Sequence, residues 1–421
     1  MFNKNKISTN DAVTEQMLIC ICSSAKENDI SRQKREKDMV DLQIGGISFR
    51  EIRETSCYYA DKTAFLEEFF QSVPPKVSII TRPRRFGKTL MMNTLNDFFD
   101  ITQDSKAIFE GLAISKNKAL CDKWMNQYPV VLFSLKGMEG RTFQDALNAY
   151  ITFIADLCMN LAYLQESPKL RPGLKNLLSV LENRTNDRGL LESSLYTVCS
   201  ALHAHWNKPV IVLIDEYDAP LARAQENGYY PEMEELYRTM LKKTIQDNDS
   251  LQFAVLTGCL RVSKERVFTG IDDIRFLDVS EPCGAGKIGF TQKEVDELLA
   301  AAGFSEKKDV IKEWYDGYRF GDDNKVYCPW DILQYVYSLR SAPDKVPESY
   351  WADTSGNDAV RILAGRTDCN AAEKIEKLLD GGYVASSISQ ALTHDTLYAS
   401  EDNLWTLLYQ AGYLTKADPR K

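Results

Sequence analysis

Histidine, closely spaced cysteines and long apolar runs are all scarce in this sequence. The 421 residues include three histidines and ten cysteines, and no two cysteines form a CxxC pair, so a structural zinc site is not expected. Several cysteines lie within apolar segments, which is typical of reduced thiols in a protein core and predicts a reducing, cytoplasmic location. Apolar runs fall well short of the roughly 18 residues of a membrane-spanning helix, so we expect no membrane partner.

An excess of positive charge is also missing. Lysine and arginine number 51 against 60 acidic residues, and the net charge of −9 argues against a surface covered in basic side chains for nonspecific nucleic-acid binding. Apolar residues make up 44% and charged residues 26% of the chain, so wholesale disorder is excluded. The length is sufficient for two or three domains.

Short apolar segments alternate with amphipathic ones after a polar beginning. Residues 1–40 are polar and mixed in charge, and we expect a disordered lead-in there. Strand-like runs follow at residues 77–81, 129–135, 209–214 and 251–257. Apolar residues with helical spacing lie between them, at residues 143–161 and 233–241. This alternation predicts a three-layer α/β fold with a parallel sheet, and helical patterns dominate after about residue 290.

The strongest motif lies at residues 81–89, between the first predicted strand and a predicted helix at 89–99. Its end, Gly87-Lys88-Thr89, has the form of a phosphate-binding P-loop. In that loop glycine permits close approach, lysine contacts the phosphates, threonine binds Mg²⁺ and the helix N-terminus offers N–H groups. Arg82 stands where the pattern usually has glycine, so the motif is degenerate, and the alternative is a basic turn that resembles a P-loop by chance.

A second motif consists of two acids after the third predicted strand, Asp215 and Glu216. A carboxylate at the carboxyl end of a strand lies where α/β sheets bind ligands. We expect Asp215 to hold Mg²⁺ and Glu216 to orient and deprotonate an attacking water. The alternative is that both acids merely cap the next turn. Two motifs in order on successive strand ends favour nucleotide binding.

Two arginine-containing segments and one threonine complete the candidate site. Thr257 ends the fourth predicted strand, and in oligomeric ATPases the strand between the two motif strands ends in a polar residue that senses the γ-phosphate. Arg261 is a candidate phosphate contact, with a solvated turn residue as the alternative. Residues 76–89 contain five cations and no acid, which predicts an anion-concentrating patch formed by Lys76, Arg82, Arg84, Arg85 and Lys88. The Gly-Lys sequence at residues 284–287 lacks a preceding strand and is expected to be a flexible loop.

The sequence resembles the AAA-ATPase-like family of bacterial proteins, whose members typically join a divergent P-loop ATPase region to a C-terminal nuclease-like domain of the PD-(D/E)XK type. The resemblance covers about residues 42–415. It rests on the segments at residues 58–63, 81–89, 210–218, 256–261, 314–321 and 350–355.

The resemblance implies roles for several residues. Lys88 and Thr89 would bind nucleotide and Mg²⁺, Asp215 and Glu216 would form the second acidic motif, and residues 82–86 would be the family's own form of the loop. No Asp followed by Glu-x-Lys on consecutive strands occurs in the last hundred residues, so we expect the nuclease-like domain and its activity to be missing.

For two of the family segments, at residues 58–63 and 314–321, the resemblance does not imply a definite role, and each has two alternative hypotheses. The segment at 58–63 either packs near the nucleotide, through Tyr59, Asp61 and Lys62, or forms a helix N-cap around Asp61. The segment at 314–321 is interpreted as an aromatic packing turn of a helical lid, with phosphate sensing by Arg319 as the alternative.

The full prediction is an ATP-binding, Mg²⁺-dependent ATPase that is slow or stimulated by a partner. Its domains would be a P-loop AAA-ATPase-like domain at 41–285 and a helical lid with a winged-helix-like region at 286–421. The expected catalytic residues are Glu216 and Lys88, and the metal ligands Thr89 and Asp215. The expected nucleotide-binding residues are Arg82, Arg84, Arg85, Phe86, Gly87, Lys88, Thr89, Thr257 and Arg261. One alternative is a nucleotide-gated module that does not hydrolyse ATP. The other is an ATPase subunit that acts with a nucleic acid or a nuclease-like partner. An oligomer is compatible with each of these predictions.

Overall fold

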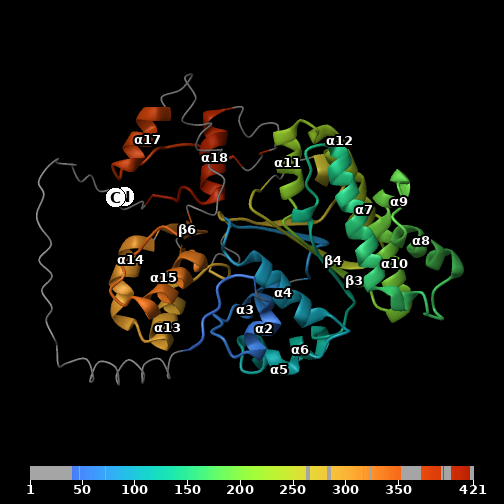
Figure 1. Ribbon diagram of the computed structural model, residues 1–421, viewed down its shortest axis with the longest axis horizontal. Coiled ribbons are helices and arrows are strands. Elements are labelled where there is room, and N and C mark those ends of the chain that lie inside the picture. Colours follow the sequence, from blue (N-terminus) through green and yellow to red (C-terminus); the bar gives the residue numbers. More distant parts are fainter. Residues whose placement is uncertain are drawn as a thin grey trace, which may run out of the picture.

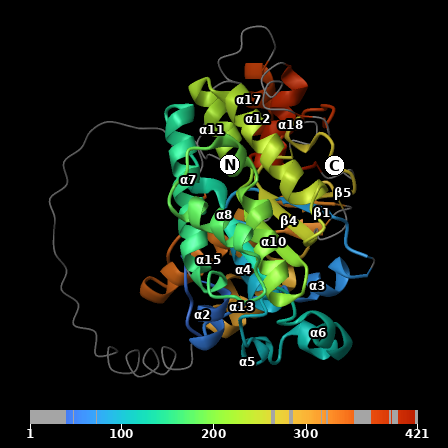
Figure 2. The same cartoon turned by 90° about the vertical axis from the view of Figure 1, so that its right-hand side faces the viewer.

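The computed structural model in Figures 1 and 2 describes residues 40–417, apart from several gaps. The gaps are residues 47, 72, 262–265, 282–285, 316, 322–323, 352–370, 390–391 and 393–399. The predicted lead-in at 1–40 therefore lies, except for Val40, outside the described residues. The same holds for Asp316, for residues 352–355 of the last family segment, and for Gly284 and Ala285.

A five-stranded parallel sheet forms the centre of the protein, in the order β2-β3-β4-β1-β5. The strands are β1 (Val77–Thr81), β2 (Val130–Ser134), β3 (Val210–Asp215), β4 (Leu251–Gly258) and β5 (Ile274–Leu277). Runs of Val, Ile, Leu and Phe that are buried on both faces suit such a sheet, and the predicted α/β class and four predicted strands are confirmed. The edge strand β5, which is only partly buried, was not predicted.

Helices cover both faces of the sheet (Figure 1). Because side chains alternate along a strand, Val77 and Ile79 face one core while Ile80 faces the other. The first core contains α7 (Phe143–Asn160), α8 (Pro172–Glu182), α9 (Arg188–Glu192), α10 (Ser194–Trp206), α11 (Ala219–Asn227) and α12 (Tyr230–Leu241). The second contains α2 (Phe49–Glu54), α3 (Ala64–Phe69), α4 (Lys88–Phe99), α5 (Lys106–Phe109) and α6 (Lys118–Trp124). The three-layer arrangement is therefore confirmed.

The C-terminal part is mostly helical, as predicted. Helices α13 (Gln292–Ala302), α14 (Lys308–Tyr315) and α15 (Pro329–Ser341) enclose their own small core. A short antiparallel hairpin, β6 (Tyr318–Phe320) and β7 (Asn324–Val326), lies between α14 and α15 in sequence and was not predicted. Helices α17 (Ala371–Leu379) and α18 (Glu401–Ala411) follow, and Figure 2 shows α18 beside the end of the sheet.

The two predicted domains share one hydrophobic core. Phe320, Val326 and Tyr409 of the C-terminal part belong to the same buried cluster as Ile80 and Phe86 of the sheet layer. The division at 285/286 stays a prediction. The shared cluster means that the two parts pack directly against each other. Among the described helices, none combines the length and the apolar character that a membrane crossing requires.

Candidate functional site

The carboxyl ends of β1, β3 and β4 meet at one edge of the sheet. In the parallel register Thr81 pairs with Gly258, and Ile214 pairs with Leu256. The segments that follow these strands therefore emerge side by side, at the place where parallel α/β sheets bind ligands. The strand order also places β4, which carries Thr257, between the two motif strands, as the sequence predicted.

The loop between β1 and α4 curls around the ammonium group of Lys88. Gly87 has φ +89°, a left-handed conformation that glycine adopts without a steric penalty, and it precedes the first turn of α4. The Lys88 side chain is buried, and its Nζ donates to the backbone oxygens of Arg82 at 2.9 Å and Pro83 at 3.0 Å. A longer contact of 3.5 Å joins Nζ to the Cys259 sulfur. The loop thus has a closed form, with its lysine fixed at the centre.

Three predicted residues from three separate segments meet at Asp215. The Oγ1 of Thr89 donates to Asp215 Oδ2 at 2.6 Å. The hydroxyl of buried Thr257 and the backbone N–H of Glu216, at 3.1 Å, both donate to Asp215 Oδ1. This carboxylate is 4% exposed, so its charge depends on these donors for compensation. The structure therefore brings Thr89, Asp215 and Thr257 into one hydrogen-bonded line.

Glu216 lies at the mouth of the site in an uncommon backbone conformation. Its φ of +54° is unfavourable for a residue with a Cβ atom, and such residues concentrate at functional sites. Burial raises the pKa of its carboxyl above the usual value, and the nearby Asp215 and Asp218 raise it further. The ammonium groups of Lys136 and Lys88 act in the opposite direction and lower it.

Lys136 reaches this site from the neighbouring strand. Ser134, the last residue of β2, pairs in register with Asp215, and Lys136 follows two residues later in the turn η2 (Leu135–Gly137). The Ser134 hydroxyl accepts the backbone N–H of Lys136 at 3.3 Å, while Leu135 is buried and anchors the turn. Sequence reasoning missed Lys136 because its position depends on the pairing of β2 with β3.

Asp218 was also missed, although it ends the acidic segment that begins at Asp215. Its Oδ2 accepts the backbone N–H groups of Cys259 and Leu260, both at 2.9 Å, and the Tyr217 hydroxyl donates to the Leu260 oxygen at 2.8 Å. The segment after β3 therefore fixes the segment after β4. The sequence did carry a signal for it, because Asp215-Glu216-Tyr217-Asp218 is a run of acidic and aromatic residues at the end of a predicted strand.

The side chains of three predicted binding residues are engaged inside the protein. Arg82 is fully buried, and its guanidinium donates to the backbone oxygens of Thr81 and Leu277 at 2.8 and 2.9 Å. Phe86 is buried among aromatic rings. Arg261 forms an ion pair with Asp278. These side chains shape the loops around the site, whereas those of Arg84 and Arg85 are exposed.

The predicted patch of five cations does not form. Lys76 precedes β1 and therefore lies at the opposite end of the strand from Lys88, and Arg82 is enclosed in the core. The surviving cations near the loop are Arg84, Arg85 and Lys88. Of the five predicted cations, Lys76 and Arg82 are therefore not available at the surface of this edge, while Lys136, which the sequence did not place here, lies near Glu216.

The motif at residues 58–63 joins the sheet layer to the C-terminal helices. The Asp61 carboxylate accepts the backbone N–H and hydroxyl of Thr63, at 2.9 and 2.6 Å, and the backbone N–H of Ala113 at 2.6 Å. Lys62 forms an ion pair of 2.5 Å with Glu294 of α13. The N-cap residue of α3 is Thr63, without a side-chain cap hydrogen bond, so the predicted helix N-cap at Asp61 is wrong. Asp61 instead ties the segment before α3 to Ala113, and Lys62 joins it to α13.

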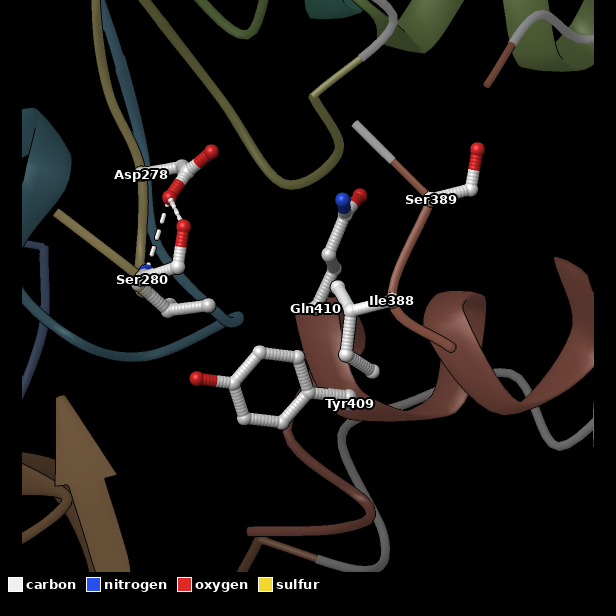
Figure 3. A pocket seen from close by; sticks show the side chains of 7 residues that line it. Asp278, Ser280, Ile388, Ser389, Tyr409 and Gln410 are labelled. Atoms are coloured by element: carbon white, nitrogen blue, oxygen red, sulfur yellow. Dashed lines mark hydrogen bonds between the residues drawn. The ribbon is translucent and has the colours of Figure 1, made fainter. Parts of the chain in front are cut away.

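A small pocket lies between the end of β5 and α18 (Figure 3). Tyr409, Gln410 and Ile388 face Asp278 and Ser280 across it. Asp278 also pairs with Arg261, whose backbone N–H donates to Gln410 Oε1 at 3.2 Å. The pocket thus belongs to a polar junction between β4, β5 and α18 rather than to the loop around Lys88.

A parallel α/β sheet with a lysine-centred loop after one strand and an acid at the end of a second is the architecture of the α/β P-loop NTPase-like fold. The chain belongs to the AAA-ATPase-like family, because the family model described as "Predicted AAA-ATPase" matches residues 43–268. A protein from Azotobacter chroococcum mcd 1, described as "Uncharacterized protein in vnfD 5'region", is 26% identical over 385 residues. The match covers 89% of this chain and 64% of that relative, so it extends beyond the part of the chain that the family model matches.

Proposed function

We propose that this protein binds ATP together with Mg²⁺ at the edge of the sheet and hydrolyses the ATP. The observation that carries the proposal is the convergence of Lys88, Thr89, Asp215 and Thr257 from three strand ends. Family membership supports a nucleotide-binding protein of the ATPase kind.

The available donors fit a magnesium nucleotide. The described residues contain no group of three or more His, Cys, Asp or Glu side chains that could hold a metal. Mg²⁺ at phosphate-transfer sites needs only one or two oxygen donors from the protein, in addition to water and phosphate oxygens. Thr89 Oγ1 and Asp215 supply such oxygens, and the N–H groups at the start of α4 and the Lys88 ammonium suit the phosphates.

Glu216 is the proposed proton acceptor for the attacking water. Burial raises the pKa of its carboxyl, which makes it a better base than an exposed glutamate. Lys136 and Lys88 favour the ionised form that this role requires. Bound Mg²⁺ would supply charge neutralisation at the phosphate oxygens.

A second candidate is a nucleotide-gated module without turnover. The observation that favours it is Arg82 at the usual glycine position, with its side chain locked in the core. The third candidate, an ATPase that acts with nucleic acid or a nuclease-like partner, now depends on the exposed Arg84 and Arg85.

ATP binding and phosphate release should be measured on the wild type and on Lys88→Ala, Glu216→Gln and the control Lys76→Ala. Lys76 lies at the far end of β1, so its variant should behave as the wild type does. We expect Lys88→Ala to lose ATP binding and Glu216→Gln to bind ATP without releasing phosphate. Unchanged binding by Lys88→Ala would refute the site. Binding without hydrolysis in the wild type would favour the gated module, and stimulation by added DNA would favour the third candidate.

A further inference from the structure

The loop around Lys88 is held from outside by polar contacts with the C-terminal part. The indole Nε1 of Trp351 donates to the backbone oxygen of Arg84 at 3.1 Å. The Arg85 guanidinium lies over the Trp330 ring, 4.2 Å from its centroid. The thiol of Cys328 makes a long contact of 3.9 Å with the backbone oxygen of Arg85. Cys328 and Trp330 at the start of α15, and Trp351 beyond its end, thus contact two consecutive loop residues.

Apolar contacts hold the rest of the same loop. The Phe86 ring meets the Tyr318 ring edge-on, with centroids 5.2 Å apart, and the Phe320 ring at 5.5 Å. Gly412, at the end of α18, lies so close to Pro83 that a Cβ at this glycine would be 2.8 Å from the proline Cβ. The loop cannot change shape without displacing these groups, because packed interiors have little free volume.

The loop also has a conformation that its sequence alone does not favour. Arg85 has φ +68°, which disfavours any residue with a Cβ atom, and the first loop position is Arg82 instead of glycine. Residues persist in such conformations where their surroundings fix them. The contacts of Trp330 and Trp351 act on this strained part of the loop.

We propose that Trp330 and Trp351 are positioning residues for nucleotide binding. They hold the backbone of Arg84 and Arg85 in the shape that accepts phosphate, and nucleotide binding changes the surroundings of both indoles in return. This inference rests on the proposed function, since it assumes that the loop binds ATP. The C-terminal part would then control the affinity of the proposed ATP site. Because coupling acts in both directions, bound ATP would in turn alter the contacts of the C-terminal part.

The test uses the full chain and three tryptophan variants. Trp351→Phe keeps the ring but removes the N–H donor, Trp330→Leu removes the face on which Arg85 lies, and Trp314→Phe, on the exposed tryptophan of α14, is the control. We expect Trp351→Phe and Trp330→Leu each to raise the Kd for Mg·ATP about three- to tenfold, the effect of one hydrogen bond or cation–π contact. The melting temperature without nucleotide should fall little in Trp351→Phe, and the control should match the wild type in both measurements.

Fluorescence and a double-mutant cycle separate positioning from general stability. ATP should change the tryptophan emission of the wild type and of Trp314→Phe, with a smaller change in Trp351→Phe. Arg85→Gly and Trp330→Leu should together weaken binding no more than either alone, because they remove the same contact.

Wild-type affinity in both Trp330→Leu and Trp351→Phe would overturn the inference while leaving the ATPase proposal intact. An absence of ATP binding by the wild type would overturn the proposed function and this inference together. Fully additive effects of Arg85→Gly and Trp330→Leu would also contradict it.

Discussion

Replacement of Asp331 by asparagine should stabilise the protein at neutral and alkaline pH. Asp331, in the first turn of α15, is 8% exposed, and its Oδ1 has no hydrogen-bond partner among the described residues. Burial raises the pKa of its carboxyl to about 6 from the ordinary 3.8, against the lowering effect of the Trp351 and Tyr350 backbone N–H groups that it accepts. The ionised carboxylate is therefore a cost to the folded state.

The magnitude follows from these two pKa values. A folded-state pKa near 6 and an unfolded value of 3.8 correspond to about 3 kcal/mol. The folded state binds the proton more tightly, so this contribution is fully present below pH 3.8 and is lost as the pH rises through about 6. Asparagine keeps an acceptor for the two N–H groups and carries no charge, so we expect a gain of about 1–3 kcal/mol above pH 7.

Urea unfolding of the wild type and Asp331→Asn at pH 4.5, 6 and 8 provides the measurement. The two curves should lie closest at pH 4.5 and be further apart at pH 6 and pH 8. Asp309→Asn, on the exposed face of α14, is the matched control and should show no growing difference. The reasoning is refuted if Asp331→Asn is less stable than the wild type at pH 8, or if the difference between them does not depend on pH.

Two further predictions concern the acids and the close packing at the site. Lys136→Ala removes the main charge that lowers the pKa of Glu216, so the acid limb of the pH–rate profile should move to higher pH, and an unmoved limb would exclude the contact. Gly258→Ala should lower stability by about 1–3 kcal/mol, because its Cβ would lie 2.6 Å from both Asp218 Oδ1 and a Tyr217 ring carbon. Thermal unfolding checks this against Gly173→Ala in α8, where no atom of the described residues lies within 4 Å of the added Cβ and no loss is expected.

Local sequence was sufficient to predict the strands and the two motifs of the site. A continuous apolar run has few alternatives to a buried strand, so 77–81 and β1 coincide, and the ends of β3 and β4 place Asp215 and Thr257 at the edge. The short, half-exposed β5 lacks that signal. Its residues form a strand because β1 offers an unpaired edge beside them.

Side-chain direction could not be predicted in the same way. Arg82, Phe86 and Arg261 lie within or beside the motifs, and chemistry alone suggested that the arginines contact phosphate. Their partners include Leu277, the last residue of β5, and Asp278 directly after it, which become neighbours only through the tertiary fold. The same dependence on strand pairing concealed Lys136.

The position of β1 inside the sheet has a consequence for synthesis of the chain. Val77 pairs with Ala254 on one side and with Ile274 on the other, so the earliest strand gains no neighbour until residues 251–277 have been made. At 5–20 residues per second, the nascent chain carries this unpaired, mostly apolar strand for roughly 10–40 s. The candidate site is assembled equally late, because Thr257 lies on β4, which is made long after Lys88 and Thr89.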